Sequence, residues 1–206
     1  MRDCAARTLR RRGAAALLAL CAAVGGAAAR PNERRDFSPF FETGQVPEGI
    51  LRSWPELSRE VAGLMISEYG RPDDYSARSL IWFGNGPWKR TVVYRDPPVR
   101  RFLGRDEEVL EQVVTYAVPD ERLKPLKRFS ERLRVNQAAG ELSIRSDSQT
   151  LNYLTLNLAH EIVVGKRSPD DAADFLDRVV RLEKAGKTSP YISGLRFSTS
   201  AGELKN

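Results

Sequence analysis

The sequence predicts an α+β fold in which an antiparallel sheet of about five strands, two hairpins among them, is covered on one face by three to four helices. Two pairs of short runs flank turn signals, as in β-hairpins, and the runs of the first pair are rich in aromatic and β-branched residues. The stretch 148–165 has the longest apolar-rich helical pattern in the chain. The elements do not alternate as regular strand–helix–strand units, which favours an antiparallel sheet over a doubly wound one.

Residues 1–29 have the pattern of a cleaved signal peptide. Arginines precede an apolar run at 14–24, and alanines at 27–29 supply the small residues that a signal peptidase needs. The apolar run is too short for an ordinary membrane span, so we expect no integral span in the mature chain. We expect an exported protein that is periplasmic or secreted after cleavage. The arginine run at 10–12 leaves two export routes open, general secretion and the twin-arginine route.

Charge and cysteine content narrow the classes of function. The full chain has a formal net charge of +6, but residues 1–29 hold five Arg and one Asp, which leaves 28 basic and 26 acidic residues. This near-neutral mature charge disfavours nucleic-acid binding. Both cysteines, Cys4 and Cys21, lie in the signal segment, so the mature chain has no disulfide, thiolate ligand or cysteine nucleophile. We expect neither a metal nor another cofactor.

The mature chain is long enough for one core and is expected to form a single domain. Residues 30–49 are polar and interrupted by prolines, which predicts an extended lead-in. The α+β domain is placed at 50–186. Residues 187–206 are rich in Ser and Gly and are interpreted as a flexible tail, with enough apolar residues for a short edge strand.

The first predicted elements are a helix and a hairpin. A capping box of Ser53 and Glu56 predicts a helix over 54–69. The runs 79–83 and 88–94 flank Gly-Asn-Gly-Pro, and Asn-Gly between two such runs is a strong hairpin signal.

Further elements follow in the second half. Alternation over 109–118 predicts a third strand. A short helix is expected from Asp120, and a second hairpin from 133–136 and 141–146. The long helix over 148–165 follows.

The two helices at the end of the domain have clear boundaries. Asp147 or Ser148 is a suitable cap for the long helix, and Gly165 suits the left-handed position after its last turn. Ser168 with a following Pro-Asp-Asp predicts the start of the next helix, which should end near Gly186.

One polar cluster falls on the long helix. Tyr153, Asn157 and His160 lie at i, i+4 and i+7, with Glu161 adjacent. They either satisfy one another between packed helices, or form a catalytic set with His160 as general base and Tyr153 as donor. His160 is the only histidine of the chain, and Val164 stands where a zinc-protease helix needs its second histidine, so a zinc site is disfavoured.

The first hairpin offers a second candidate site. Trp82, Trp88, Lys89 and Arg90 bring two indoles and two cations to one hairpin end, a composition that suits docking of another protein or of a small anionic or aromatic ligand. The alternative is that the indoles pack across the hairpin and the cations are solvated. Arg145, on the strand over 141–146, is a further candidate for holding an anionic group.

Several phrases of the sequence resemble an uncharacterised family of secreted bacterial proteins. They are YGRPDD at 69–74, LIWFGNGPWKRTVVYR at 80–95, LEQVVTYAVP at 110–119, GELSIRSD at 140–147 and NYLTLNLAHEIVVGKR at 152–167. The resemblance spans roughly 54–185. It implies export and a single domain, and it implies no particular activity.

Two classes of function remain after these observations. The favoured hypothesis is an exported extracytoplasmic binding or protein-interaction domain without catalysis, whose ligand or partner the sequence does not identify. The alternative is a hydrolase-like enzyme that uses His160 as general base on an anionic substrate held by Arg90 or Arg145. A solvent-reaching pocket at His160 distinguishes the two.

Overall fold

The computed structural model describes residues 48–96 and 108–199, and it confirms the α+β class. A six-stranded antiparallel sheet has the order β1-β2-β3-β4-β6-β5. Its strands are β1 Asp74–Tyr75, β2 Ser79–Phe83, β3 Arg90–Tyr94, β4 Leu110–Thr115, β5 Leu133–Asn136 and β6 Glu141–Ser146. The predicted signal peptide and almost all of the lead-in at 30–49 lie outside the described residues.

Five helices accompany the sheet in the described part of the chain: α1 Glu48–Arg52, α2 Glu56–Tyr69, α3 Asp120–Phe129, α4 Gln149–Val163 and α5 Pro169–Lys184. The prediction of about five strands and three to four helices is therefore close. The additional elements are α1 and β1, which have five and two residues and are too short to show a periodicity.

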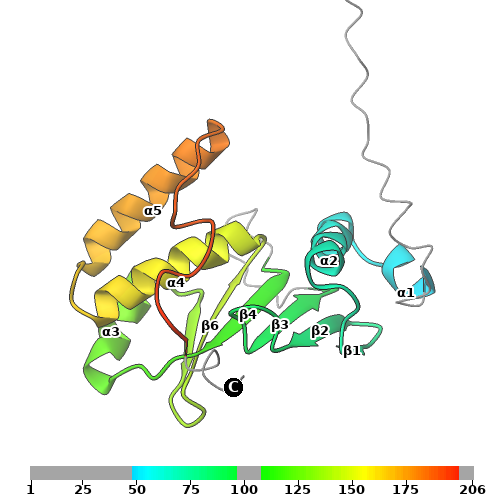
Figure 1. The fold of residues 1–206 in the computed structure, drawn as a ribbon, viewed down its shortest axis with the longest axis horizontal. Coiled ribbons are helices and arrows are strands. Elements are labelled where there is room, and N and C mark those ends of the chain that lie inside the picture. Colours follow the sequence, from blue (N-terminus) through cyan, green and yellow to red (C-terminus); the bar gives the residue numbers. More distant parts are fainter. Residues whose placement is uncertain (1–47, 97–107, 200–206) are drawn as a thin grey trace, which may run out of the picture. The chain divides into compact units, whose positions relative to one another are not determined.

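Helices lie along one face of the sheet (Figure 1). α2 contacts β3, while α4 contacts β4 and β6 and is packed in turn by α3 and α5. Two apolar clusters fill the space below the helices, one beneath α2 and one around α4. The strand pairing places Leu110, Gln112 and Val114 of β4 on the helix-covered side, with Ile144 of β6 paired to Gln112.

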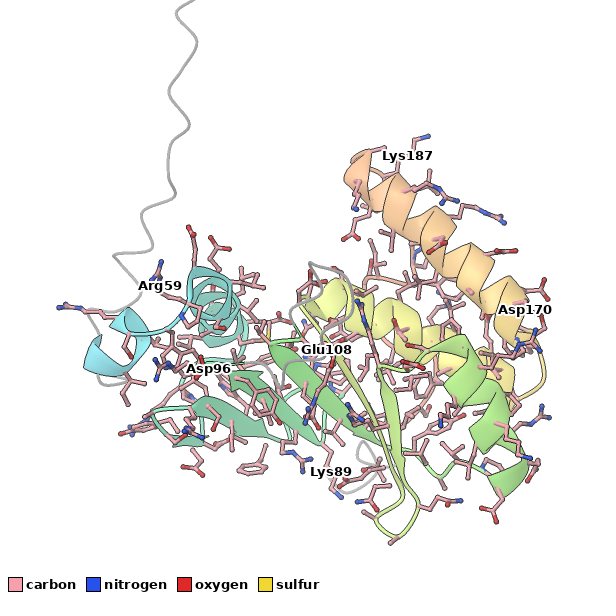
Figure 2. All side chains as sticks on the ribbon, turned by 180° about the vertical axis from the view of Figure 1, so that it is seen from behind. Arg59, Lys89, Asp96, Glu108, Asp170 and Lys187 are labelled. Atoms are coloured by element: carbon pink, nitrogen blue, oxygen red, sulfur yellow. The ribbon has the colours of Figure 1, made fainter. Side chains whose placement is uncertain are left out.

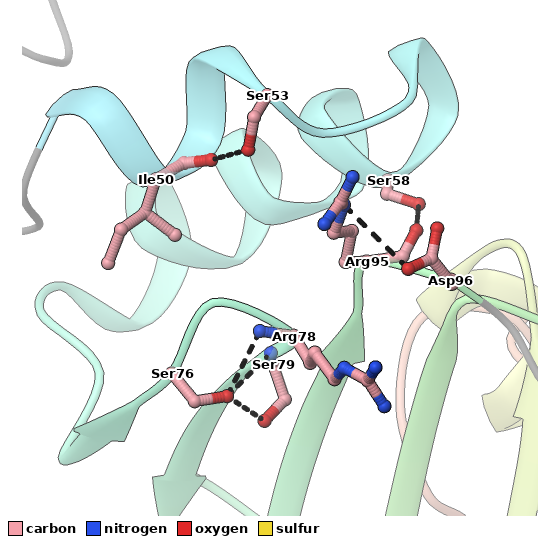
Figure 3. Close-up of polar contacts among 8 residues, drawn as sticks. All are labelled: Ile50, Ser53, Ser58, Ser76, Arg78, Ser79, Arg95 and Asp96. Atoms are coloured by element: carbon pink, nitrogen blue, oxygen red, sulfur yellow. Dashed lines mark hydrogen bonds and ion pairs between the residues drawn. The ribbon is translucent and has the colours of Figure 1, made fainter.

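α2 is fixed by contacts that differ from the predicted capping box. Its N-cap is Pro55, without a side-chain cap, and Ser53 Oγ instead donates to the carbonyl of Ile50 in α1 at 2.9 Å. Ser58, fully buried, donates to the carbonyl of Arg95 at 2.8 Å and so ties α2 to the end of β3 (Figure 3). The capping-box prediction was wrong because Ser53 completes the last turn of α1.

The same view shows how the first two strands are joined. Ser76 Oγ accepts hydrogen bonds from the amides of Arg78 and Ser79, both at 3.1 Å (Figure 3). A serine that bonds amides two and three residues ahead stabilises a tight turn. This turn brings the two-residue strand β1 beside β2, with Tyr75 paired to Leu80.

α4 begins and ends where the sequence predicts. Ser148 is its N-cap and accepts from the amide of Leu151 at 3.3 Å. Gly165 has φ 76°, and its amide donates to the carbonyl of Ile162 at 3.1 Å. Eight residues of this helix are buried, including Asn152 and Asn157. α4 is therefore covered on several sides, and its polar side chains need partners inside the protein.

The described part of the C-terminal region, residues 187–199, forms turns and no strand. Ile192 is buried, and Tyr191, Leu195 and Phe197 pack against the apolar cluster around α4. We call residues 187–199 the C-terminal segment. Among the described residues, no helix is long and apolar enough to cross a membrane.

Candidate functional site

A groove opens between α2 and α4, and we call it the α2–α4 groove. Its volume is 570 Å³. It is lined by Val61, Leu64, Met65, Ser67 and Glu68 of α2, by Leu110, by Asp147, Ser148, Gln149, Thr150 and Tyr153 around the start of α4, and by Ile192 and Ser193. Small-molecule sites have volumes of roughly 300–1,000 Å³. The groove thus has the size of a ligand site and is built from elements distant in sequence.

Apolar side chains form much of the groove. Leu64 is 55% exposed although it lies on the same helix face as the buried residues Val61 and Met65. Leu110 closes the floor, and Ile192 of the C-terminal segment forms part of one wall. A half-exposed leucine beside a hollow of this size is available for contact with a bound molecule.

A chain of hydrogen bonds leads from the buried sheet to a carboxylate at the groove. Ser146 Oγ donates to Asn152 Oδ1 at 2.7 Å, and Asn152 Nδ2 donates to Gln112 Oε1 at 3.0 Å. Gln112 Nε2 donates to Gln149 Oε1 at 2.5 Å. Gln149 Nε2 donates to both oxygens of Glu68, at 2.8 and 2.9 Å. We call these five residues the polar relay.

The amide hydrogen bonds of the polar relay all run in the same direction, from the buried sheet to Glu68. Each amide accepts at its oxygen and donates from its nitrogen, so the hydrogen bonds are aligned and polarise one another toward Glu68. Gln112 and Asn152 are fully buried, whereas the carboxylate of Glu68 is exposed. The relay therefore holds one exposed negative charge in a fixed position at the groove.

Tyr69 supports the same arrangement from beside the groove. Its hydroxyl donates to Gln149 Oε1 at 2.7 Å and accepts from Trp88 Nε1 at 3.1 Å. Burial and the neighbouring Tyr153 raise the pKa of Tyr69, so its hydroxyl stays protonated and remains a donor. The orientation of the Gln149 amide is thus set by two donors at its oxygen.

The predicted cluster of Tyr153, Asn157, His160 and Glu161 does not form one site. Tyr153 points toward the α2–α4 groove and stacks on Trp88, with ring centroids 4.9 Å apart. His160 instead bonds Tyr116, with 2.8 Å between Nδ1 and the hydroxyl, and stacks on Phe197 with centroids 4.7 Å apart.

Asn157 is used by the C-terminal segment. Its Nδ2 donates to the carbonyls of Tyr191 and Gly194 at 2.9 and 2.8 Å, and its Oδ1 accepts from the amide of Arg196 at 2.7 Å. Asn157 is 1% exposed. Three hydrogen bonds to backbone groups replace the pairing that a strand would have given this segment.

Glu161 is also committed to that segment. Tyr191 hydroxyl and Arg167 Nε donate to its two oxygens at 2.5 and 2.6 Å. Burial by itself raises the pKa of Glu161, but the hydrogen bonds from Tyr191 and Arg167 outweigh it and lower the pKa. For His160, burial and the nearby Lys166 lower the pKa, so its neutral form is favoured.

The two tryptophans of the first hairpin lie in different parts of the core. Trp82 is 2% exposed, belongs to the cluster beneath α2, and donates from Nε1 to the carbonyl of Gly70 at 3.0 Å. Trp88 is fully buried in the cluster around α4. Lys89 pairs with Glu141 at 2.8 Å and is marked in Figure 2. Arg90, the fourth residue of this candidate site, is the first residue of β3.

Arg145 lies on the other face of the sheet from the helices, where it forms a compact cluster. Its Nε donates to Glu111 Oε2 at 2.6 Å, and its guanidinium lies over the ring of Tyr94 at 5.0 Å. Tyr94 hydroxyl donates to the same Glu111 oxygen at 2.8 Å. Burial and the hydrogen bond to Glu111 raise the pKa of Tyr94 to about 12. The charge of Arg145 is therefore balanced by Glu111.

No group of three or more His, Cys, Asp and Glu side chains within the described ranges is arranged to hold a metal ion. A scan against protein-family models and searches of curated proteins and of solved structures found no match to this chain. The resemblance to a family of secreted bacterial proteins thus stays a prediction.

Sequence reasoning found Tyr153 but missed the other residues that define the groove. In the sequence, Glu68 is typical of the exposed face of an amphipathic helix, and Leu64 is typical of its buried face. One signal was present, because Gln112 alternates with Leu110 and Val114 on the inward side of a predicted strand. A polar side chain at such a position needs a buried partner, which indicates a hydrogen-bond network.

Proposed function

We propose that the protein is an exported extracytoplasmic binding domain without catalysis, and that its ligand binds in the α2–α4 groove. The observation that carries the proposal is the fixed carboxylate of Glu68 beside an open hollow of 570 Å³. Pre-orienting a side chain lowers the entropy lost when a ligand binds. Export rests on the signal-peptide pattern of residues 1–29.

The composition of the groove supports binding rather than catalysis. Among the described lining residues there is no histidine, cysteine, lysine or arginine, so the usual pairings of nucleophile and base are missing from this set. Glu68 accepts two hydrogen bonds from Gln149, so both of its carboxylate oxygens are already engaged by a neighbouring side chain.

The partner in this proposal is a protein or a small ligand, and nucleic acid is disfavoured by the near-neutral mature charge. Docking of an anionic or aromatic ligand at the first hairpin has weaker support. Trp82 and Trp88 are buried, and the charges of Lys89 and Arg145 are paired. Arg90 is the remaining cation of that set.

A fragment screen followed by NMR spectroscopy tests the proposal. Isotope-labelled protein, purified after expression of the full chain, is titrated with a library of small fragments up to about 1 mM. We expect hits that shift the amide signals of α2 and the first turns of α4. The variant Leu64→Ala should weaken them, whereas Leu182→Ala, a change at another exposed leucine that is 38% exposed on α5, should not.

Two results would contradict the groove as the binding site. Fragment hits that cluster elsewhere on the protein would place the site elsewhere. Equal loss of binding in Leu64→Ala and Leu182→Ala would mean that the effect does not come from the groove. Because both leucines are exposed, neither change is expected to disturb folding by more than a few tenths of a kcal/mol.

The alternative, a hydrolase-like enzyme with His160 as general base, is favoured by the surroundings of that side chain. His160 is only partly buried, its pKa is lowered, and Tyr116 fixes the orientation of its ring. Its expected helpers Asn157 and Glu161 are engaged by the C-terminal segment. Turnover of p-nitrophenyl acetate or p-nitrophenyl phosphate by the purified protein that His160→Gln abolishes would support this alternative over the binding domain.

A further inference from the structure

We propose that the ligand of the α2–α4 groove is a small amphipathic cation, an apolar molecule that carries one ammonium or guanidinium group paired with Glu68. This inference rests on the proposed function and names the chemical class of its ligand. Its basis is the position of a fixed negative charge next to an apolar hollow, together with the balance of charge around that hollow.

The described groove residues carry negative charge only. Glu68 and Asp147 are its two acids, and no basic side chain is among the described residues that line it. Both acids are exposed, so neither charge is withdrawn into the core. Electrostatic complementarity between a site and its ligand sets which ligands are accepted. A cation is favoured here, and an anion would meet two carboxylates.

One positive contribution has to be weighed against the acids. The N-terminus of α4 faces the groove through Ser148, Gln149 and Thr150, and a helix N-terminus carries about half an elementary charge. The hydroxyl of Ser148 already accepts from the amide of Leu151, which satisfies part of that end. Two full carboxylate charges exceed this half charge. The groove therefore remains a site for cations.

Glu68 differs from an ordinary surface carboxylate because its position is set from inside the protein. Both of its oxygens accept from Gln149, whose amide is held by Gln112 and Tyr69. An exposed ion pair is usually weak because two flexible side chains must be immobilised. In this groove one side of the pair is already immobilised. The polar relay is therefore a mainly buried hydrogen-bond network that fixes the position of a carboxylate at the protein surface.

The apolar part of the groove suits a small molecule rather than a protein surface. Leu64 is the one strongly exposed apolar side chain of the described lining, since Val61, Met65, Leu110 and Ile192 are buried. Stable protein interfaces need about 1,000 Å² of buried surface or more. A hollow of 570 Å³ with one exposed leucine matches a compact apolar group attached to a cation.

Three probes of equal chain length and different charge test this inference: n-octylammonium chloride, octan-1-ol and sodium octanoate. Each is titrated at pH 7 and low salt into isotope-labelled protein purified from the full chain, below its aggregation concentration. We expect octylammonium to bind most tightly and octanoate most weakly, with shifts at the amides of α2 and the start of α4. Added salt should weaken octylammonium binding and leave octanol unchanged.

Two matched variants assign the preference to Glu68. Glu68→Gln keeps an acceptor for Gln149 and removes the charge, so it should lower the affinity for octylammonium about fivefold, or roughly 1 kcal/mol, and leave octanol unchanged. Asp177→Asn removes an equal charge from an exposed position of α5 that does not line the groove, and it should change neither affinity. Leu64→Ala should weaken all three probes.

The outcomes separate this inference from the proposed function. Equal binding of all three probes in the groove, or an unchanged octylammonium affinity in Glu68→Gln, would refute the cationic ligand and leave the binding groove in place. Absence of binding by all three probes would also refute it if fragments still bind the groove. Absence of both probe and fragment binding would refute the groove as well.

Discussion

Replacing Asn157 by alanine is the sharpest test of how α4 holds the C-terminal segment. Its side chain makes three hydrogen bonds to the backbone of residues 191, 194 and 196, and it is 1% exposed. A buried hydrogen bond contributes about 1 kcal/mol net, which gives about 3 kcal/mol for three. The freed backbone groups are partly rehydrated when the segment detaches, so we expect a loss of about 2–3 kcal/mol.

Urea unfolding of the purified protein measures this loss, and hydrogen exchange locates it. The amide of Arg196, which donates to Asn157, should lose its protection in Asn157→Ala before the amides of β4 do. The control is Asn136→Ala, because Asn136 is exposed and accepts one bond, from the amide of Ala139 at 3.2 Å. It should cost at most about 0.5 kcal/mol.

A loss below about 1 kcal/mol in Asn157→Ala, with protection of Arg196 unchanged, would refute this reasoning. It would mean that the apolar contacts of Ile192 and Phe197 hold the segment without the amide. A loss as large as expected but uniform over all amides would show that the segment is not a separate unit of unfolding. The first result would remove the structural role that we assign to Asn157, and the second would refute the separate unfolding of the C-terminal segment.

Three further predictions concern titration and the polar relay. The single histidine, His160, should give an NMR titration midpoint below 6.5, and Lys166→Ala should move that midpoint upward. Because the pKa of Glu161 is lowered in the folded state, Glu161→Gln should destabilise the protein above about pH 4.5. Urea unfolding measures the difference in unfolding free energy between the two proteins, and this difference should vanish as pH falls through the lowered pKa. Gln112→Leu should cost about 1–3 kcal/mol in the same assay, since it leaves buried partners of the polar relay without a hydrogen bond.

Local signals in the sequence identified the elements whose ends are set by single residues. Ser148 and Ser168 cap α4 and α5 as predicted, and both side chains accept an amide of the first turn. Gly165 takes a positive φ after the last turn of α4. These features depend on contacts within a few residues, so the sequence alone contains the required information.

The first hairpin contains a feature that local sequence patterns did not predict, the burial of Trp88. The signal Asn85-Gly86 predicts two strands at this place, and β2 and β3 are paired there. The second strand begins at Arg90 rather than at Trp88, and the loop between them turns Trp88 into the cluster around α4. Alternation within a strand does not apply to a residue in a loop, so the burial of Trp88 was not predictable from its neighbours.

The groove was not predicted because it depends on pairing between distant strands. β6 lies between β4 and β5, so α4 follows β6 across the middle of the sheet. In this order, Gln149 of α4 comes within hydrogen-bond distance of Glu68 of α2, 81 positions away in the sequence. A single sequence gives the period of each element but not which elements are neighbours in the sheet.

The two ends of α4 serve different purposes, and the C-terminal segment connects them. Asn157 and Glu161, in the second half of the helix, hold the backbone and side chain of Tyr191. The next residues, Ile192 and Ser193, line the α2–α4 groove beside the first turn of the same helix. Asn157 and Glu161, two members of the cluster that the sequence analysis considered as catalytic, therefore position one wall of the proposed binding groove.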